Sequence, residues 1–165
     1  MIDCVVVGTD HRLQSSDTAL KAHLAHLARN HNFGLVAEEC AADASTVAGQ
    51  VASSLGVPHL PIDMTDAERK EAGIYDRLCI RPKMRFDPAS GYQEEHVYLR
   101  HADGVRENFW LDKIEAITCE GQVLVVCGYL HLDPLSEKAR RRRHRVTKTV
   151  FPEDLPGRIR FEVLD

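Results

Sequence analysis

The sequence predicts an α/β fold, a three-layer sandwich built on a mostly parallel central sheet of about four to five strands. Its first half alternates between short apolar runs and segments whose apolar residues recur at helical spacing. This alternation is typical of parallel strands joined by right-handed helical crossovers. The chain has 165 residues, of which 44% are hydrophobic and 28% charged, and this composition suits a folded domain. We therefore expect residues 1–165 to form a single α/β domain.

The first strand and helix are predicted by a clear change of pattern. Ile2–Thr9 is almost continuously apolar and rich in valine, as expected of a central strand that is covered on both faces. Ser15, Ser16 and Asp17 then offer side chains that could cap a helix. The inward positions of this helix are Leu20, Leu24, Leu27 and His31, and Asn32 is its expected stop.

A second strand and helix follow, and then a third strand. Phe33–Ala37 is the second apolar run. Asp43 or Ser45 is expected to cap the next helix, and Gly56 to end it. The inward positions of that helix are Ala44, Val47, Val51 and Leu55. Val57–Ile62 is the third strand, and its two prolines favour a short strand or an edge position.

The second half of the chain is less regular. Thr65–Tyr75 indicates a short polar helix, and Arg81–Gln93, with two prolines and a glycine, indicates an inserted loop. A helix is expected over Asp103–Ile117, followed by a fourth apolar strand at Val123–Cys127. Residues 158–165 alternate between polar and apolar side chains, which predicts a last edge strand.

Composition limits the classes of function. The net charge of −4 gives no general attraction to nucleic acid or to an anionic membrane. The amino terminus lacks a signal-peptide pattern, and no stretch approaches the roughly 18 apolar residues of a membrane span, so a cytoplasmic protein is expected. The five cysteines lack Cys-x-x-Cys spacing and indicate buried free thiols, as for Cys4 and Cys127 in apolar strands. Cys40 is the exception, because it follows two glutamates and could approach a metal.

Two segments of the sequence carry an apolar strand into the same motif, Gly-x-x-His. They are Gly8-Thr9-Asp10-His11 and Gly128-Tyr129-Leu130-His131. In an open parallel sheet, ligands bind beyond the carboxyl ends of the strands, so both histidines are expected at that edge. The glycines would let the chain turn sharply and let a ligand approach. The alternative is that each histidine makes only local hydrogen bonds.

Carboxylates and an arginine are expected at the same edge. Glu38 and Glu39 end the second strand, and because neighbours on a strand face opposite ways, the sequence leaves open which of them joins the histidines. Arg106 lies one helical turn before Trp110 on an apolar stripe and therefore faces inward, near His131. Its guanidinium could hold a carboxylate or a developing oxyanion, or it could form a structural salt bridge to either glutamate.

The order of these motifs resembles the TraB/TIKI superfamily, which includes erythromycin esterase-like and ChaN-like proteins. The resemblance rests on both Gly-x-x-His segments, on Glu38-Glu39, and on Arg106-Glu107-Asn108-Phe109-Trp110. It implies a three-layer α/β core. For TIKI-like members it also implies hydrolysis that depends on a divalent metal, with the two histidines and a glutamate as the polar cluster.

The sequence therefore predicts a hydrolase that activates water through a metal or through His and Glu. The candidate metal ligands are His11, His131 and Glu38 or Glu39, which would suit zinc, manganese or cobalt. Arg106 is the candidate clamp for an oxyanion or a carboxylate. Asp10 and Asp43 are candidates for orienting an imidazole.

Other functions remain open at this point. The same edge could bind phosphate or haem without catalysis. The basic run Arg140–Arg145 could contact nucleic acid, although the solvated face of a helix is the favoured interpretation. The expected partner is a small-molecule or peptide substrate, without nucleic acid or membrane, and a homodimer stays open.

Overall fold

The computed structural model describes residues 1–74 and 91–152, and for residues 91–100 the backbone alone. Its centre is a five-stranded sheet in the order β3-β2-β4-β1-β5, in which every neighbouring pair is parallel. The strands are β1 (Asp3–Thr9), β2 (Phe33–Glu38), β3 (His59–Pro61), β4 (Gln122–Gly128) and β5 (Arg145–Phe151). The predicted α/β sandwich is thus confirmed.

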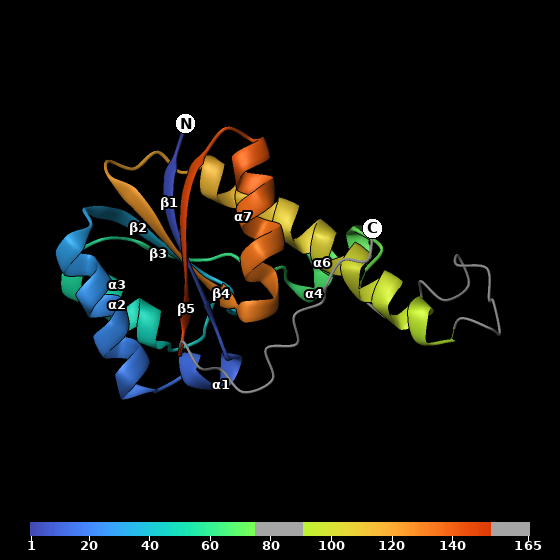
Figure 1. Ribbon diagram of the computed structural model, residues 1–165, viewed down its shortest axis with the longest axis horizontal. Coiled ribbons are helices and arrows are strands. Elements are labelled where there is room, and N and C mark those ends of the chain that lie inside the picture. Colours follow the sequence, from blue (N-terminus) through green and yellow to red (C-terminus); the bar gives the residue numbers. More distant parts are fainter. Residues whose placement is uncertain (75–90, 153–165) are drawn as a thin grey trace.

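Helices cover both faces of the sheet (Figure 1). The helices are α1 (His11–Gln14), α2 (Thr18–Asn30), α3 (Val47–Leu55), α4 (Asp66–Glu71), α6 (Gly91–Glu115), α7 (Leu132–Arg141) and the one-turn helix η2 (Tyr129–His131). α2 and α3 lie on one face, and α6 and α7 lie on the other. No helix within the described ranges is both long enough and apolar enough to cross a membrane.

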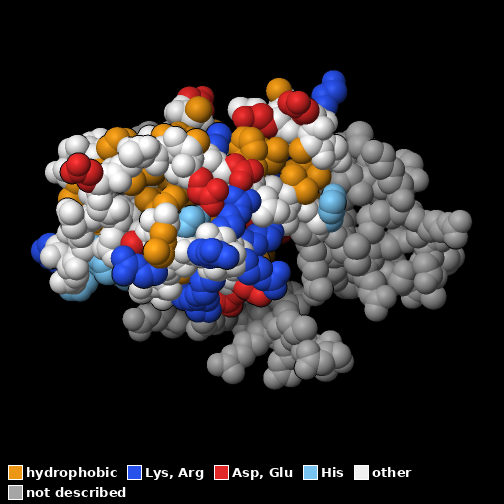
Figure 2. All heavy atoms as spheres, turned by 90° about the horizontal axis from the view of Figure 1, so that it is seen from above, with side chains coloured by type: hydrophobic (Ala, Val, Ile, Leu, Met, Phe, Trp, Pro, Cys, Tyr) orange, Lys and Arg blue, Asp and Glu red, His pale blue; other side chains and the backbone are white. Residues whose placement is uncertain are grey.

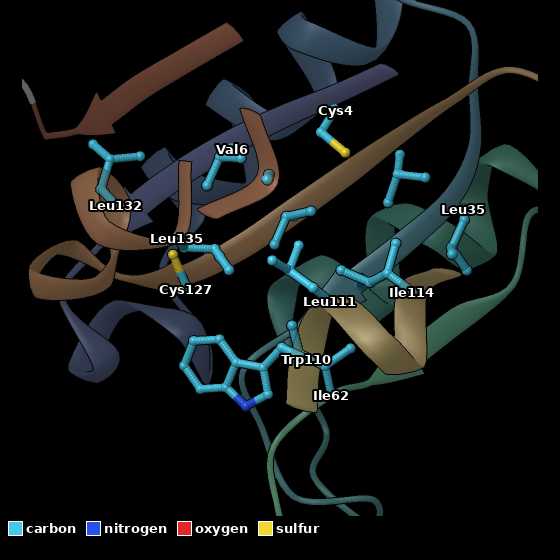
Figure 3. Packing of buried hydrophobic residues seen from close by; sticks show 14 residues of the cluster. Cys4, Val6, Leu35, Ile62, Trp110, Leu111, Ile114, Cys127, Leu132 and Leu135 are labelled. Carbon is cyan, nitrogen blue, oxygen red and sulfur yellow. The ribbon is translucent and has the colours of Figure 1, made fainter. Parts of the chain in front are cut away.

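Alternation along the central strands divides the core into two layers. Val5 and Val7 face α2 and α3, where they join Leu20 and Leu24. Val6 faces the other way, toward a layer that includes the completely buried side chain of Trp110 (Figure 3). The members of that layer that α6 and α7 contribute are Trp110, Leu111, Ile114, Leu132, Leu135 and Ala139. A strand buried on both faces explains the continuous apolar runs of β1 and β4.

Local signals fix most helix ends. Asp17 caps α2, and Thr65 caps α4 through a capping box with Glu68. Gly56 ends α3 in a left-handed conformation, as predicted. The expected cap of α3 was wrong, because Thr46, rather than Asp43 or Ser45, accepts the hydrogen bond from the first turn.

Two predictions for the second half of the chain need correction. α6 begins at Gly91 rather than at Asp103, so residues 91–93 of the expected loop are helical, and the helix ends at Glu115 before Ile117. The remainder of that loop and residues 158–165 lie outside the described part of the chain. The sequence did not predict β5, which within the described residues pairs with β1 alone and whose side chains are exposed or half-buried.

Candidate functional site

The two Gly-x-x-His segments interlock at the carboxyl ends of β1 and β4. These strands are neighbours, with Thr9 paired to Gly128. A Cβ atom on Gly128 would lie 2.5 Å from His11 Nε2, and one on Gly8 would lie 3.0 Å from Leu132 Cβ. Each glycine therefore makes room for the segment that follows the other strand. This reciprocal packing explains the glycine of each motif.

His11 is the solvent-facing member of the site. Its side chain is 57% exposed, and its Nε2 lies 3.7 Å from Glu39 Oε2. Its Nδ1 lies 2.9 Å from Gln14 Oε1, an oxygen that can only accept a hydrogen bond. When Nδ1 donates to Gln14 Oε1, the neutral ring carries its lone pair on Nε2, facing Glu39.

Glu39 is the buried carboxylate at the centre of the site. Its Oε2 accepts a hydrogen bond from the backbone N–H of Gly128 at 2.8 Å, and its Oε1 accepts one from Arg106 Nη2 at 2.5 Å. Both histidines face it, because His131 Nε2 lies 3.6 Å from Oε1 while His11 lies near Oε2. The guanidinium and the amide thus hold one oxygen each of this buried carboxylate.

Arg106 faces inward from α6, as predicted, and forms the salt bridge to Glu39 that the sequence left open. It also binds Asp63 through Nε at 3.1 Å and Nη2 at 3.0 Å, and its Nη1 lies 3.4 Å from Asp103. Its Cζ atom lies 4.9 Å from the centre of the Trp110 ring. Burial lowers the pKa of the guanidinium, but the charges of Glu39 and Asp63 outweigh burial and raise it.

A second carboxylate, that of Glu107, contacts His131. Its Nδ1 lies 2.8 Å from Glu107 Oε1, and Lys138 Nζ lies 2.7 Å from the other oxygen of Glu107. Its Nε2 faces Arg106 Nη1 at 3.4 Å, and its ring meets Trp110 edge to face. Burial lowers the pKa of His131, but the hydrogen bond to Glu107 and the charges of Glu39 and Asp103 outweigh burial and raise it above its usual value.

Glu38 lies on the opposite face of β2 and does not join this cluster. Its Oε2 accepts hydrogen bonds from Thr46 Oγ1 at 2.5 Å and from His59 Nε2 at 2.9 Å. The position of Glu38 opposite Val126 places it on the side of α2 and α3, so Glu39 points to the side of α6 and α7. The two adjacent glutamates thus serve different sites.

Glu38 belongs to a group that has the spacing of a metal site. Within the described residues, the one set of three or more His, Cys, Asp or Glu ligand atoms lying within 4.8 Å of one another is Glu38, Cys40 and His59. Burial and then the charge of Glu38 raise the pKa of the Cys40 thiol to about 12. The predicted ligand set of His11, Glu39 and His131 does not form such a group.

The remaining candidates have other roles. Asp10 caps α1 and pairs with Arg12, whose hydrogen bonds lower the pKa of this half-buried carboxyl to about 2. Asp43 is exposed on the surface before α3, away from the core. Among the described residues, neither carboxylate forms a hydrogen bond or an ion pair with an imidazole. Cys4 and Cys127 are buried free thiols, as predicted.

Sequence reasoning missed three polar residues that the structure brings to these sites. Asp63 comes just after β3, so the rule that assigned Glu38 and Glu39 to a strand end would have found it. Glu107 follows Arg106 directly, but only the packing of α7 against α6 shows that it meets His131. His59 is the first residue of β3, the strand that two prolines predicted to be short or at an edge.

The basic run at the end of α7 shares its surface with acidic residues. Arg142 binds Asp112 at 2.5 Å and Glu115 at 3.2 Å, and Arg145 lies 3.2 Å from Asp3. Figure 2 shows Lys and Arg side chains gathered on one face, with Asp and Glu side chains between them. The run itself is part helix, part turn and part strand, because α7 ends at Arg141 and β5 begins at Arg145. The expectation of a single helical face was therefore wrong.

No protein-family model matches the chain, and no curated protein or solved structure matches it either.

Proposed function

We propose that the chain is a hydrolase that activates water between His11 and Glu39. One observation carries the proposal: two imidazole Nε2 atoms face the two oxygens of a single buried carboxylate, at 3.7 Å for His11 and 3.6 Å for His131. Of these groups, His11 is open to solvent, and a substrate can approach from its side. The proposal keeps the class of reaction that the resemblance to the TraB/TIKI superfamily implies.

The spacing between His11 and Glu39 suits one water molecule. At 3.7 Å, Nε2 of His11 and Oε2 of Glu39 are both within hydrogen-bond reach of a single water that donates to each. His11 Nε2 takes a proton as the water oxygen bonds to the electrophilic carbon of an ester or amide. The same proton then passes to the leaving group, whose bond to that carbon breaks. Water is consumed, and no oxidant or reductant is required.

Arg106 and the Gly128 amide hold this geometry. Arg106 fixes Oε1 of Glu39, and the Gly128 amide fixes Oε2, so the carboxylate cannot rotate freely. His131 Nε2 lies 3.6 Å from Oε1 and 3.4 Å from Arg106 Nη1, so it borders the same oxygen of Glu39 as the guanidinium. Arg106 is shared with Asp63 and Asp103, so its role in the proposal is to position Glu39.

The proposed reaction does not involve a metal ion. Zinc, manganese or cobalt on His11, Glu39 and His131 would require three converging ligand atoms, and these residues do not supply such a group. The Arg106 guanidinium also lies 3.4 Å from His131 Nε2, so a second positive charge would sit beside a fixed one.

The test is hydrolysis of a panel of chromogenic esters, amides and phosphoesters by the full chain in the presence of a chelator. We expect turnover of an ester or amide that falls by about 10²- to 10⁴-fold in His11→Ala, because a general base is lost. His11 is exposed, so this variant should fold. The matched control is His26→Ala, an exposed histidine on α2. Equal rates in His11→Ala and wild type, or no hydrolysis of any member of the panel, would refute the proposal.

A further inference from the structure

We propose that Glu38, Cys40 and His59 form a metal-binding site for a thiophilic divalent cation, with zinc as the preferred ion. The ligand atoms of these three residues lie within 4.8 Å of one another. The site lies on the opposite face of β2 from Glu39, so it is separate from the proposed hydrolytic site and does not depend on it.

The fold brings the three residues together at one end of two paired strands. Glu38 is the last residue of β2, and Cys40 follows two residues later. His59 opens β3, which pairs with β2 through Val36. The His59 ring packs closely against α3 at Gly49, where a Cβ atom would lie 3.2 Å from its Nδ1.

A buried polar atom at this site lacks a partner. Glu38 is 0% exposed, and its Oε2 already binds Thr46 and His59. Its Oε1 is buried without a hydrogen-bond partner in the described part of the chain. Burying a carboxylate oxygen unpaired is unfavourable, and such atoms commonly mark an ion or water that the protein binds. A cation held between Glu38, Cys40 and His59 would satisfy this carboxylate.

The donor set selects the kind of ion. A thiolate, an imidazole and a carboxylate are the ligands of zinc, whereas magnesium and calcium prefer oxygen ligands alone. A bound cation deprotonates a coordinating thiol, and it would replace the proton shared by His59 Nε2 and Glu38 Oε2. Three protein ligands leave the fourth tetrahedral position to water.

The first test measures metal binding by the untagged full chain. After dialysis against Zn²⁺ or Co²⁺, we expect one equivalent of metal per chain and, with Co²⁺, a thiolate-to-cobalt charge-transfer absorption band. The band should disappear in Cys40→Ser, and the metal content of His59→Ala should fall at least tenfold. Cys119→Ser and His26→Ala, a half-buried thiol and an exposed imidazole outside the site, are the matched controls and should keep both signals. Absence of stoichiometric metal, or a cobalt band that persists in Cys40→Ser, would overturn the assignment.

The second test distinguishes a loss of metal binding from misfolding of the variant. Because the site exists in the folded chain, a bound ion should stabilise that state. We expect Zn²⁺ to raise the melting temperature of wild type and of His11→Ala by several degrees, and Mg²⁺ to leave it unchanged. Cys40→Ser, melting cooperatively without metal, should show no Zn²⁺ shift. An equal Zn²⁺ shift in Cys40→Ser and wild type would contradict the proposal, while the hydrolysis assay, run with chelator, reports on the other site alone.

Discussion

Replacing Gly128 with alanine should separate function from stability. The new Cβ atom would lie 2.5 Å from His11 Nε2 and 3.1 Å from Cε1, so the imidazole must leave its place beside Glu39. The backbone of Gly128 has φ −57° and ψ 140°, which an alanine adopts without strain. Because the obstructing atoms belong to the end of an exposed side chain, they can move at small cost.

The expected change in the free energy of unfolding follows from two opposing effects. Gly→Ala at a compatible backbone position stabilises a fold by about 0.4–1 kcal/mol, because it reduces the conformational entropy of the unfolded chain. The lost contact of His11 with Glu39 is worth about the same, since the imidazole is more than half exposed. We therefore expect Gly128→Ala to remain within about 1 kcal/mol of wild type, or within about 2–4 °C in melting temperature.

Two other glycines provide the comparison. A Cβ atom on Gly8 would lie 3.1 Å from the backbone Cα of Tyr129, and one on Gly34 would lie 1.7 Å from the backbone oxygen of Glu120. Overpacking against atoms that cannot rotate away costs about 1–3 kcal/mol or more. The loss of stability should therefore increase from Gly128→Ala to Gly8→Ala to Gly34→Ala.

The assay is urea unfolding followed by the fluorescence of Trp110, the one tryptophan of the chain, with ester hydrolysis measured on the same samples. Gly128→Ala should unfold near the wild-type midpoint and hydrolyse as slowly as His11→Ala. If Gly128→Ala were as unstable as Gly34→Ala, the distinction between a movable side chain and a fixed backbone would be wrong. Wild-type hydrolysis in a folded Gly128→Ala protein would contradict the role of His11.

Two further predictions concern titratable groups. The folded-state pKa of His131 is raised above its usual value, so its protonation contributes stability that is complete below about pH 6.5 and is lost as pH rises through the folded-state pKa. Glu107→Gln removes the largest cause that raises this pKa, so the urea midpoint should depend less on pH above about pH 6.5 than in wild type; an unchanged pH dependence would contradict this account. Burial raises the pKa of Cys4 to about 12 and that of Cys127 well above its usual value, so mass spectrometry should find both thiols alkylated by iodoacetamide only after unfolding, and rapid labelling of the native chain would contradict their burial.

The fold was largely predictable because its central strands are buried on both faces. β1 and β4 show continuous apolar runs, and such runs distinguish them from helices by their length and their valines. β5 has the opposite character: Arg145 and Lys148 are exposed, and only the pairing of its backbone with β1 makes it a strand. Its sequence offered no apolar period that could be recognised.

The candidate site was predictable in its position and only partly in its members. The strand-end rule placed His11, Glu39 and His131 at one edge of the sheet, and the structure brings them together. Which glutamate faces them could not be derived, because adjacent residues on a strand differ only in the face that the register assigns to them. The contact of Glu107 with His131 depends on where α7 packs against α6, and a local pattern does not contain this information.

The register of β2 is set at Gly34, far from either glutamate in the strand. There the pairing with β4 shifts, so that Phe33 pairs with Gln122 while Leu35 pairs with Val123. Side chains along a strand point alternately to its two faces, so the register after this shift decides which carboxylate enters which site. One backbone irregularity therefore sorts two identical neighbouring side chains into two different chemical environments. Deletion of the extra residue at Gly34 would shift the residues that follow it by one position and exchange both assignments at once.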